Sequence, residues 1–596
     1  MAKRELPRTG APKQNTFFGG AAILAVGILV VKLIGMFYKI PLVNIIGQEG
    51  TADFNNAYNI YAVLLTISTA GLPVAVSKLV SEANALGRRN QVKRIFRLAL
   101  AAFLTLGVLS FMVMYFKADW LAGLMNDSKA AAGIRTLAPA VICVGCLAAF
   151  RGYSQGHSNM APTSISQIIE ALCKLVVGLG LAYWLVSAGQ PSHIAAAGAI
   201  TGVTVGTVVA LAYMLLNHAV GLGRERLTDD IPDPNGKIMG DILRIAIPIT
   251  LSSSMVGIVT VIDSSLVQGQ LQRVLFENPE SWALYAEFID LSALETALKN
   301  WDLQRLAAAA SAESYSMALL DTQVAAGNAA AEALHEALES ASRAIYGNYS
   351  GALNIYNLPS SLMVAMTSSV IPAVSGALAR KDRKGAANIT SSALRISAML
   401  AFPMGVGLFV LGTPIIKLLF TTLEPGLAGP LLSTLGLATV FVCMMLVCNS
   451  ILQANGFVNL PVVVMVLGGV VKIVSNYNMV AIPEIGIFGV PFGNVLCFGL
   501  CLVLDLVIIS RVLRGRPKYF SIFLKPFIAA AVMGAGAWGV YGLAFKVTSS
   551  NSISVLAAIG VAVVIYAVLI VALKAIDRND LALMPKGEKI AKLLKL

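Results

Sequence analysis

The sequence predicts an all-α membrane protein of about fourteen transmembrane helices, built as two parallel six-helix lobes plus two C-terminal helices. Three observations support this fold class. Hydrophobic residues make up 57% of the 596-residue chain and charged residues 13%, whereas about a quarter of a soluble domain is charged. The apolar runs suit helices, which need about 20 residues to cross the hydrocarbon core, and exceed barrel strands in length. The chain also contains an internal duplication.

The apolar spans group as six, six and two along the chain. Their expected positions are 16–46, 58–86, 95–116, 131–153, 162–188, 193–217, 240–269, 350–378, 387–412, 430–454, 458–481, 485–511, 521–545 and 552–574. The predicted N-lobe is 16–217, the C-lobe combines 240–270 with 347–512, and the last two spans lie in 513–575. The short polar segments are expected in the cytoplasm: 1–15, 218–239 and 576–596.

Two sequence patterns recur about 300 positions apart. The run at 155–162 returns at 453–461, and each copy is followed by a lysine, Lys174 or Lys472. A tyrosine-asparagine pattern at 58–77 recurs in the same register. Because six is an even number of spans, both copies enter the membrane from the same side. The duplication therefore predicts parallel repeats with a substrate site between them.

Basic residues gather in alternate loops. The loops at 88–97, 380–384 and 511–518 are rich in lysine and arginine, whereas the loop at 47–53 has none. The positive-inside rule then predicts that both termini are cytoplasmic. The positive-inside rule, together with attraction to anionic membrane lipids, is enough to explain the formal net charge of +13. We therefore expect no nucleic-acid partner.

The sequence offers only weak evidence for a metal site or a redox-active disulfide. The seven cysteines lie in apolar spans, where Cys143 and Cys146 form a lone C-x-x-C without a second pair. None of the four histidines has zinc-ligand spacing. We therefore expect no metal site and no cofactor, and coupling to Na⁺ or H⁺ is left open.

One segment, 271–346, breaks the apolar pattern. It contains eleven acidic and four basic residues. Apolar residues at helical spacing predict two or three amphipathic helices, and the expected topology places them outside the cell. The segment is either a tolerated insertion between the halves or a docking module for an extracytoplasmic partner.

Ionisable residues within the spans are the candidate functional site, because a charge at mid-membrane costs about 3 kcal/mol or more. The candidate cations for a substrate cavity are Lys32, Lys39, Lys174, Lys472 and Arg151. The candidate acids, for coupling or as counter-ions, are Glu170 and Asp263. Two alternatives stay open: Glu170 could simply neutralise Lys174 one helical turn away, and Arg151 could be an anchor near a span end.

Movement between two lobes requires positions where helices bend. The candidate hinges are Pro41, Gly71, Pro73 and Pro372, and Pro73 and Pro372 occupy matching places in the two copies. Kinks that only serve helix packing explain the same residues equally well.

Several motifs resemble a known family. The motifs are 32–41, 70–73 and 150–156, followed by Asn159, Pro162 and Gln167. They look like the stage V sporulation protein B branch of polysaccharide-biosynthesis proteins, within the multidrug/oligosaccharidyl-lipid/polysaccharide (MOP) superfamily. The resemblance covers the chain except about 270–346 and the extreme tails.

This resemblance implies a bacterial plasma-membrane protein with fourteen helices and a central cavity, which flips undecaprenyl-pyrophosphate-linked precursors such as lipid II. In related lipid II flippases a cation of the first helix contacts the pyrophosphate, and Lys32 matches that position. Two other arginines of those flippases have no cationic counterpart near Thr66 and Asn354.

The sequence therefore predicts a lipid-linked oligosaccharide flippase, with lipid II as the leading substrate and a role in cell-wall synthesis or sporulation. The alternatives are a flippase for another polysaccharide repeat unit and a drug/cation antiporter of the same fold, which would favour acids in its cavity. A membrane enzyme is disfavoured because no paired carboxylates or transferase motifs stand at a span end. A scaffold of the division or sporulation machinery is the remaining class.

Overall fold

The computed structural model describes residues 14–69, 71–157, 159–222, 230–307, 316–457, 459–512, 519–573 and 575, and every regular element in these ranges is helical. The first half comprises α1 (Gln14–Thr69), α2 (Leu72–Ala85), α3 (Arg89–Phe116), α4 (Ala118–Leu124), α5 (Ala130–Gly156), α6 (Ala161–Cys173), α7 (Leu179–Ser187) and α8 (Ser192–Leu222). The rest comprises α9 (Asn235–Glu277), α10 (Ser292–Ala307), α11 (Met317–Ala325), α12 (Ala329–Ala379), α13 (Arg383–Leu419), α14 (Pro425–Ala454), α15 (Leu460–Val480), α16 (Val490–Val512), α17 (Tyr519–Thr548) and α18 (Asn551–Ala572). The predicted tail at 576–596 and most of the predicted N-terminus lie outside the described residues.

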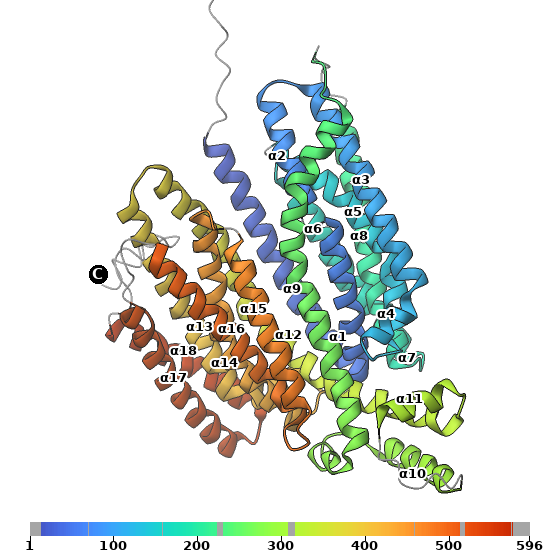
Figure 1. Cartoon of the computed structure of the whole chain (residues 1–596). Coiled ribbons are helices and arrows are strands. Elements are labelled where there is room, and N and C mark those ends of the chain that lie inside the picture. Colours follow the sequence, from blue (N-terminus) through green and yellow to red (C-terminus); the bar gives the residue numbers. More distant parts are fainter. Residues whose placement is uncertain are drawn as a thin grey trace, which may run out of the picture.

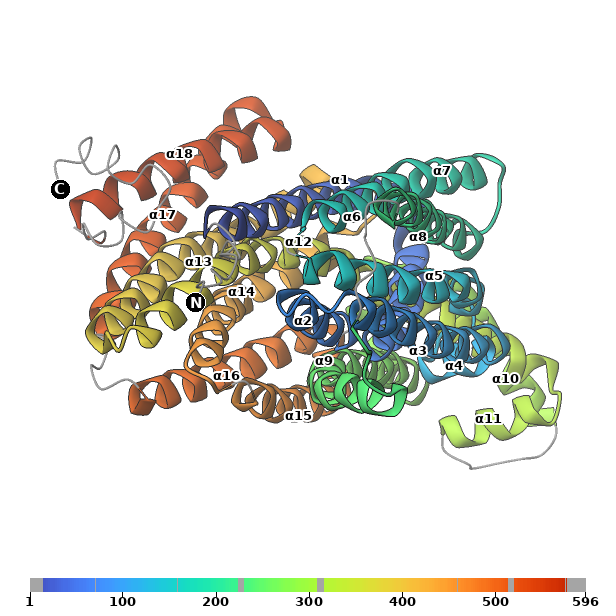
Figure 2. The same ribbon diagram turned by 90° about the horizontal axis from the view of Figure 1, so that it is seen from above.

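The helices form two bundles (Figures 1 and 2). Helices α2 to α8 make one lobe and α13 to α16 the other, while the long helices α1, α9 and α12 run between them. Helices α17 and α18 flank the second lobe, where α13 packs against both of them. The predicted fold class, an all-α membrane protein with two lobes, is confirmed.

Eleven helices within the described residues are long and apolar enough to cross a membrane. In that count α1 and α2 form a single candidate span, and α9 and α12 are not included. A chain with so many apolar helices is a multi-pass membrane protein. The number fourteen stays a prediction.

Helix α1 is interrupted at Gly47 rather than by a loop. Gly47 has a φ of 72°, a conformation that glycine adopts without steric cost, and helical structure resumes at once. The expected loop at 47–53 is therefore mostly the first turns of a second helical arm. This arm runs to Thr69, and α2 continues after a short break.

The predicted hinge residues occupy different settings. Pro41 lies within the helical run of α1, Pro73 lies in the first turn of α2, and Pro372 lies within α12. Gly71 stands at the break before α2, where an added Cβ would lie 2.1 Å from the Ala246 carbonyl oxygen. Close packing against α9 explains this glycine directly. Its role in bending stays a prediction, as do those of the three prolines.

The acidic segment builds on extensions of α9 and α12. Between them lie a 3₁₀ turn at Pro279–Leu284 and the helices α10 and α11, at the lower right of Figure 1. Trp301 is fully buried and its ring lies 5.3 Å from that of Phe276. Tyr285 accepts a 3.0 Å hydrogen bond from the Ile487 backbone N–H. The segment thus has its own apolar core and is attached to the second lobe.

Candidate functional site

Two lysines, one on α1 and one at the end of α6, converge on a group of aromatic rings. The Lys174 Nζ lies 4.9 Å from the centroid of Tyr38 and 4.7 Å from that of Tyr58. The Lys39 Nζ lies 5.3 Å from the centroid of Phe54, and the Phe54 and Tyr58 rings stack at 6.0 Å. We call these five residues the lysine–aromatic cluster. Its rings attract the ammonium groups through their negative faces.

Carboxylates do not neutralise this cluster within the described part of the chain. No described acid lies within 4.0 Å of Lys39 or Lys174. Lys39 instead donates a 3.1 Å hydrogen bond to the neutral Asn55 Oδ1, and the two ammonium groups repel each other. Two cations in partly buried surroundings without an acid make the cluster a site that favours an anion.

A local change of helix geometry accompanies Lys174. Residues Lys174–Gly178 form a π-helical turn between α6 and α7, a feature that often occurs at functional sites. An added Cβ at Gly178 would lie 2.7 Å from the Ala199 carbonyl oxygen and 3.2 Å from the Tyr38 ring. At Gly202 it would lie 2.5 Å from the Gly178 nitrogen. These glycines let α8 and α1 approach the turn that presents Lys174.

Glu170 is engaged by Arg151 rather than by Lys174. The Arg151 Nη2 lies 3.0 Å from Glu170 Oε2, and Arg151 Nε donates a 3.0 Å hydrogen bond to Ser166 Oγ. The side chains are 14% and 26% exposed, respectively. The alternative that Glu170 neutralises its helical neighbour Lys174 is therefore wrong in this structure. Whether Arg151 or Glu170 takes part in transport stays a prediction.

Lys472, which corresponds to Lys174 in the second copy of the repeat, forms a largely buried ion pair. Its Nζ is 2.8 Å from Asp263 Oδ2, which joins α15 to α9. Asn476 donates to Asp263 Oδ1 at 2.5 Å, and the lysine and aspartate side chains are 14% and 7% exposed. Lys472 is thus held by an acid, unlike Lys174. The structure brings the two predicted residues together but leaves their function untested.

Lys32 stands apart from both groups. It is exposed on α1, two helical turns before Lys39. Its neighbours Leu33 and Phe37 are also exposed, at 44% and 63%. Its contact with a substrate stays a prediction.

The structure reveals a buried charge network that sequence reasoning missed. Arg343 of α12 reaches across to α1, with Nη1 3.4 Å from Asp53 and Nη2 3.5 Å from Glu49. Glu339, one turn earlier, accepts a 2.5 Å hydrogen bond from Ser128 Oγ. Arg343 is only 4% exposed. We call these residues, together with the buried Asp127, the acid–arginine seam.

The seam joins the two lobes at the end of the molecule that carries α10 and α11. Asn56 donates a 2.8 Å hydrogen bond to Asp127, a loop residue whose pKa is raised by burial. Nearby, Asn44 donates to the Leu419 carbonyl at 2.8 Å and Gln48 to the Thr422 carbonyl at 2.9 Å. An added Cβ at Gly347 would overlap the Gln48 carbonyl oxygen. This end is therefore closed by direct contacts between the lobes.

No short-range signal could have identified the seam. Arg343 and Asp53 are 290 positions apart, so only the packing of α12 on α1 joins them. Asp505 of α16 is expected from the sequence to be an anchor near a span end, but it is fully buried and lacks a hydrogen-bond partner on either carboxylate oxygen within the described structure. Within the same residues, no group of three or more His, Cys, Asp and Glu side chains could hold a metal ion.

Comparisons with known proteins cover nearly the whole chain. Residues 17–274 match the family model described as polysaccharide biosynthesis protein, and residues 305–574 match that of the lipid II flippase MurJ. An uncharacterized membrane protein of Bacillus subtilis, YabM, is 23% identical over 98% of this chain and 97% of its own length. The B. subtilis lipid II flippase MurJ and stage V sporulation protein B are each 29% identical, over 30% and 34% of this chain and 35% and 39% of their own lengths.

Solved structures share the fold. The lipid II flippase MurJ in an inward closed conformation superposes with a TM-score of 0.63 at 13% identity, covering 92% of this chain and 98% of that one. An inward-facing multidrug resistance MATE family transporter of the MOP superfamily gives 0.58 at 14% identity, covering 82% and 98%. At such identities the likeness establishes the fold alone.

Proposed function

We propose that the chain is a flippase of the polysaccharide-biosynthesis and lipid II flippase families, whose models match its two halves, and that it flips an undecaprenyl-pyrophosphate-linked cell-wall precursor, lipid II, across the membrane. The families it matches are transport proteins, and their fold places two lobes around a substrate path. The observation that carries the proposal is the lysine–aromatic cluster.

The charge of the cluster favours an anionic substrate. Lys39 and Lys174 are two basic side chains with no described acid beside them. A pyrophosphate supplies the missing negative charge, and ammonium groups bind phosphate as point charges that can also release it. A cation antiporter would need the opposite arrangement, with acids facing its substrate.

An apolar groove supports a lipid-linked cargo. A pocket of about 370 Å³ lies between α12, α13, α17 and α18. Its walls are wholly apolar and include Leu358, Leu362, Met404, Met533 and Val563. Two of the four helices, α17 and α18, lie beyond the duplicated halves. We assign this groove to the polyprenyl chain, whose transfer from lipid into an apolar groove costs little.

The basic loops set the proposed orientation. The α2–α3 and α12–α13 turns lie at the end opposite α10 and α11, so the positive-inside rule assigns that end to the cytoplasm. The acid–arginine seam then closes the extracytoplasmic end. In this proposal the structure is an inward-oriented state, and breaking the seam would release the substrate outward.

The test is rescue of bacteria depleted of their own lipid II flippase by the full-length chain, with lipid II in the outer leaflet as the readout. We expect the wild type to restore translocation and the double variant Lys39→Ala/Lys174→Ala to fail at equal membrane abundance. Lys546→Ala, which removes an exposed lysine at the end of α17, is the matched control and should rescue.

The Lys32→Ala variant tests the residue that family resemblance assigns to the site, independently of Lys39 and Lys174, which the structure assigns to it. Its failure to rescue would add Lys32 to the site. Failure of the wild type to restore lipid II translocation would overturn lipid II as the substrate. Full rescue by the Lys39→Ala/Lys174→Ala variant would overturn the cluster as the anion site.

A further inference from the structure

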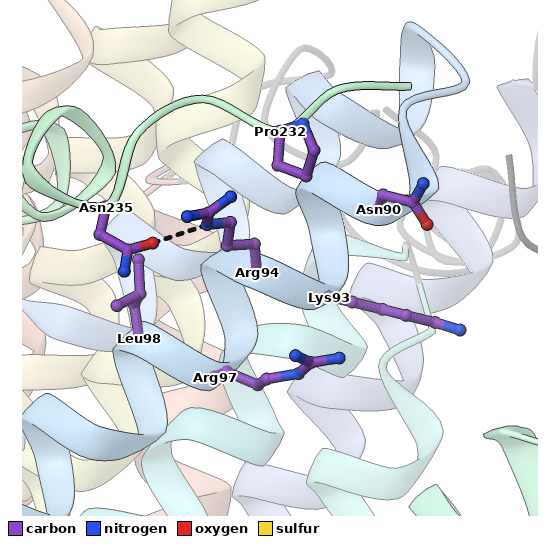
Figure 3. Close-up of a pocket in the computed structure, with 7 residues that line it drawn as sticks. All are labelled: Asn90, Lys93, Arg94, Arg97, Leu98, Pro232 and Asn235. Atoms are coloured by element: carbon purple, nitrogen blue, oxygen red, sulfur yellow. Dashed lines mark hydrogen bonds between the residues drawn. The ribbon is translucent and has the colours of Figure 1, made fainter. Parts of the chain in front are cut away.

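A second basic site lies away from the lysine–aromatic cluster, where α3 begins. A pocket of about 430 Å³ is walled on one side by α3 and on the other by the linker that leads into α9 (Figure 3). The lining residues are Asn90, Lys93, Arg94, Arg97, Leu98, Pro232 and Asn235. Lys93 and Arg94 each lie about one helical turn before Arg97, so the three cations belong to the same short stretch of α3.

The linker is fastened to α3, so the pocket is preformed. The Asp230 carboxylate accepts hydrogen bonds from the Asn90 and Gln91 backbone N–H groups at 3.0 and 2.9 Å. The Asp233 carboxylate lies 3.6 Å from Arg88 and accepts a 3.2 Å hydrogen bond from the Gln91 side chain. Asp230 and Asp233 thus fasten the linker to the start of α3.

The arginines in the pocket are not neutralised by described acids. Arg94 Nε donates a 2.6 Å hydrogen bond to the neutral Asn235 Oδ1, which fixes the guanidinium, and no described residue forms a hydrogen bond with its two terminal nitrogens. No described carboxylate lies within 4.0 Å of Arg94 or Arg97, and the Arg97 side chain is exposed. A planar fork held in place suits a phosphate oxygen pair.

The position of the pocket along α3 indicates where its ligand comes from. Arg97 is the last charged residue before the apolar run from Leu98 to Phe116, so it marks the boundary between headgroups and hydrocarbon. Leu98 adds an apolar wall beside the cations. A phosphate carried on an apolar tail matches both parts, whereas a free phosphate matches only the cations.

We propose that this pocket binds the phosphate of an anionic phospholipid of the inner leaflet. Arg94 and Arg97 hold the phosphate, Asn235 orients Arg94, and Leu98 contacts the start of the acyl chains. Because the linker connecting the two halves forms one wall, bound lipid joins the first lobe to α9. The site does not depend on which substrate the chain transports.

The experiment is a lipid titration of the purified full-length chain in detergent, followed by native mass spectrometry. We expect phosphatidylglycerol to bind in preference to zwitterionic phosphatidylcholine, and Arg94→Gln/Arg97→Gln to weaken the phosphatidylglycerol site by about tenfold or more for each arginine. The matched control is Arg380→Gln/Arg383→Gln, which removes two cations from the α12–α13 turn at the same end of the molecule.

Two further measurements distinguish a specific lipid site from general surface charge and from a soluble phosphate ligand. Arg94→Lys/Arg97→Lys keeps the charge but loses the planar fork, so it should bind more weakly than the wild type and more tightly than the glutamine variant. Equal losses in the pocket variant and the α12–α13 control would overturn the site in favour of general surface charge. Displacement of the lipid by millimolar inorganic phosphate would overturn the lipid assignment and indicate a soluble phosphate ligand.

Discussion

Lys174 and Lys472 occupy the same place in the two copies of the repeat, yet their surroundings differ in charge. Lys174 lies against the rings of Tyr38 and Tyr58 without a described acid nearby, whereas Lys472 is locked to Asp263 at 2.8 Å. The same backbone position thus gives an anion-attracting cation in one lobe and a neutral pair in the other. Duplication preserved the helix that carries the lysine, and divergence of its neighbours changed what the lysine can do.

The residues one helical turn before and after each lysine differ between the two copies. Asn476, one turn after Lys472, helps to hold Asp263, while the matching position after Lys174 is Gly178. One turn before, Glu170 of the first copy corresponds to Gly468 of the second, where an added Cβ would lie 2.4 Å from Cys501 Sγ. In the second copy this position allows close helix packing, whereas in the first copy it forms an ion pair with Arg151.

The largest effect is expected on stability when the second-lobe pair is broken. Lys472→Met leaves Asp263 buried without its cation, and we expect the free energy of unfolding to fall by about 3–5 kcal/mol. Unfolding of the purified protein in mixed micelles measures this loss. Replacing both partners, as in Lys472→Met/Asp263→Leu, should recover most of it. An unchanged stability of the single variant would show that the pair is not structural.

Lys174→Met should instead affect transport. Among the described residues, Lys174 makes cation–π contacts and no ion pair, so we expect stability to change by about 1 kcal/mol. Translocation should fall about 10- to 100-fold, because the phosphate loses a charged partner. Reconstituted vesicles with a labelled lipid-linked substrate provide the rate. A Lys174→Met variant with normal transport would remove the functional difference between the two lysines.

Removing a ring from the first-lobe cluster should have a smaller effect. Tyr58→Leu keeps both lysines but removes one aromatic face from Lys174, which is worth about 0.5–2 kcal/mol. We expect a two- to thirty-fold loss of transport, with the same vesicles as the assay. Tyr115→Leu, which changes an exposed tyrosine on α3, is the matched control. Equal losses in both variants would assign the effect to general packing.

The smallest effect is expected at the partly exposed pair of the first lobe. Glu170→Gln keeps a hydrogen-bond acceptor for Arg151, so the variant replaces a charged hydrogen bond by a neutral one, a difference of about 1 kcal/mol. We expect transport within about twofold of the wild type at neutral pH, measured with and without a proton or sodium gradient. Loss of the response to one gradient would instead identify Glu170 as a coupling residue.

The sequence alone determined the class of molecule and its duplication. Long apolar runs can satisfy their backbone only as membrane helices, and the recurrence of 155–162 at 453–461 is visible without coordinates. It also selected the charged residues that the two copies carry in their spans. These properties are local in the chain, so hydropathy and spacing reveal them.

Tertiary structure decided which of these charges meet. Glu170 is one turn from Lys174 in sequence but binds Arg151 of α5, and Lys472 finds its acid on α9. Arg343 joins Asp53 across 290 positions. Even the end of the first span differs from expectation, because Gly47 turns the chain within a single residue. Ion pairs depend on distances of a few ångströms between separate helices, and helix rotation and packing set those distances, which hydropathy does not encode.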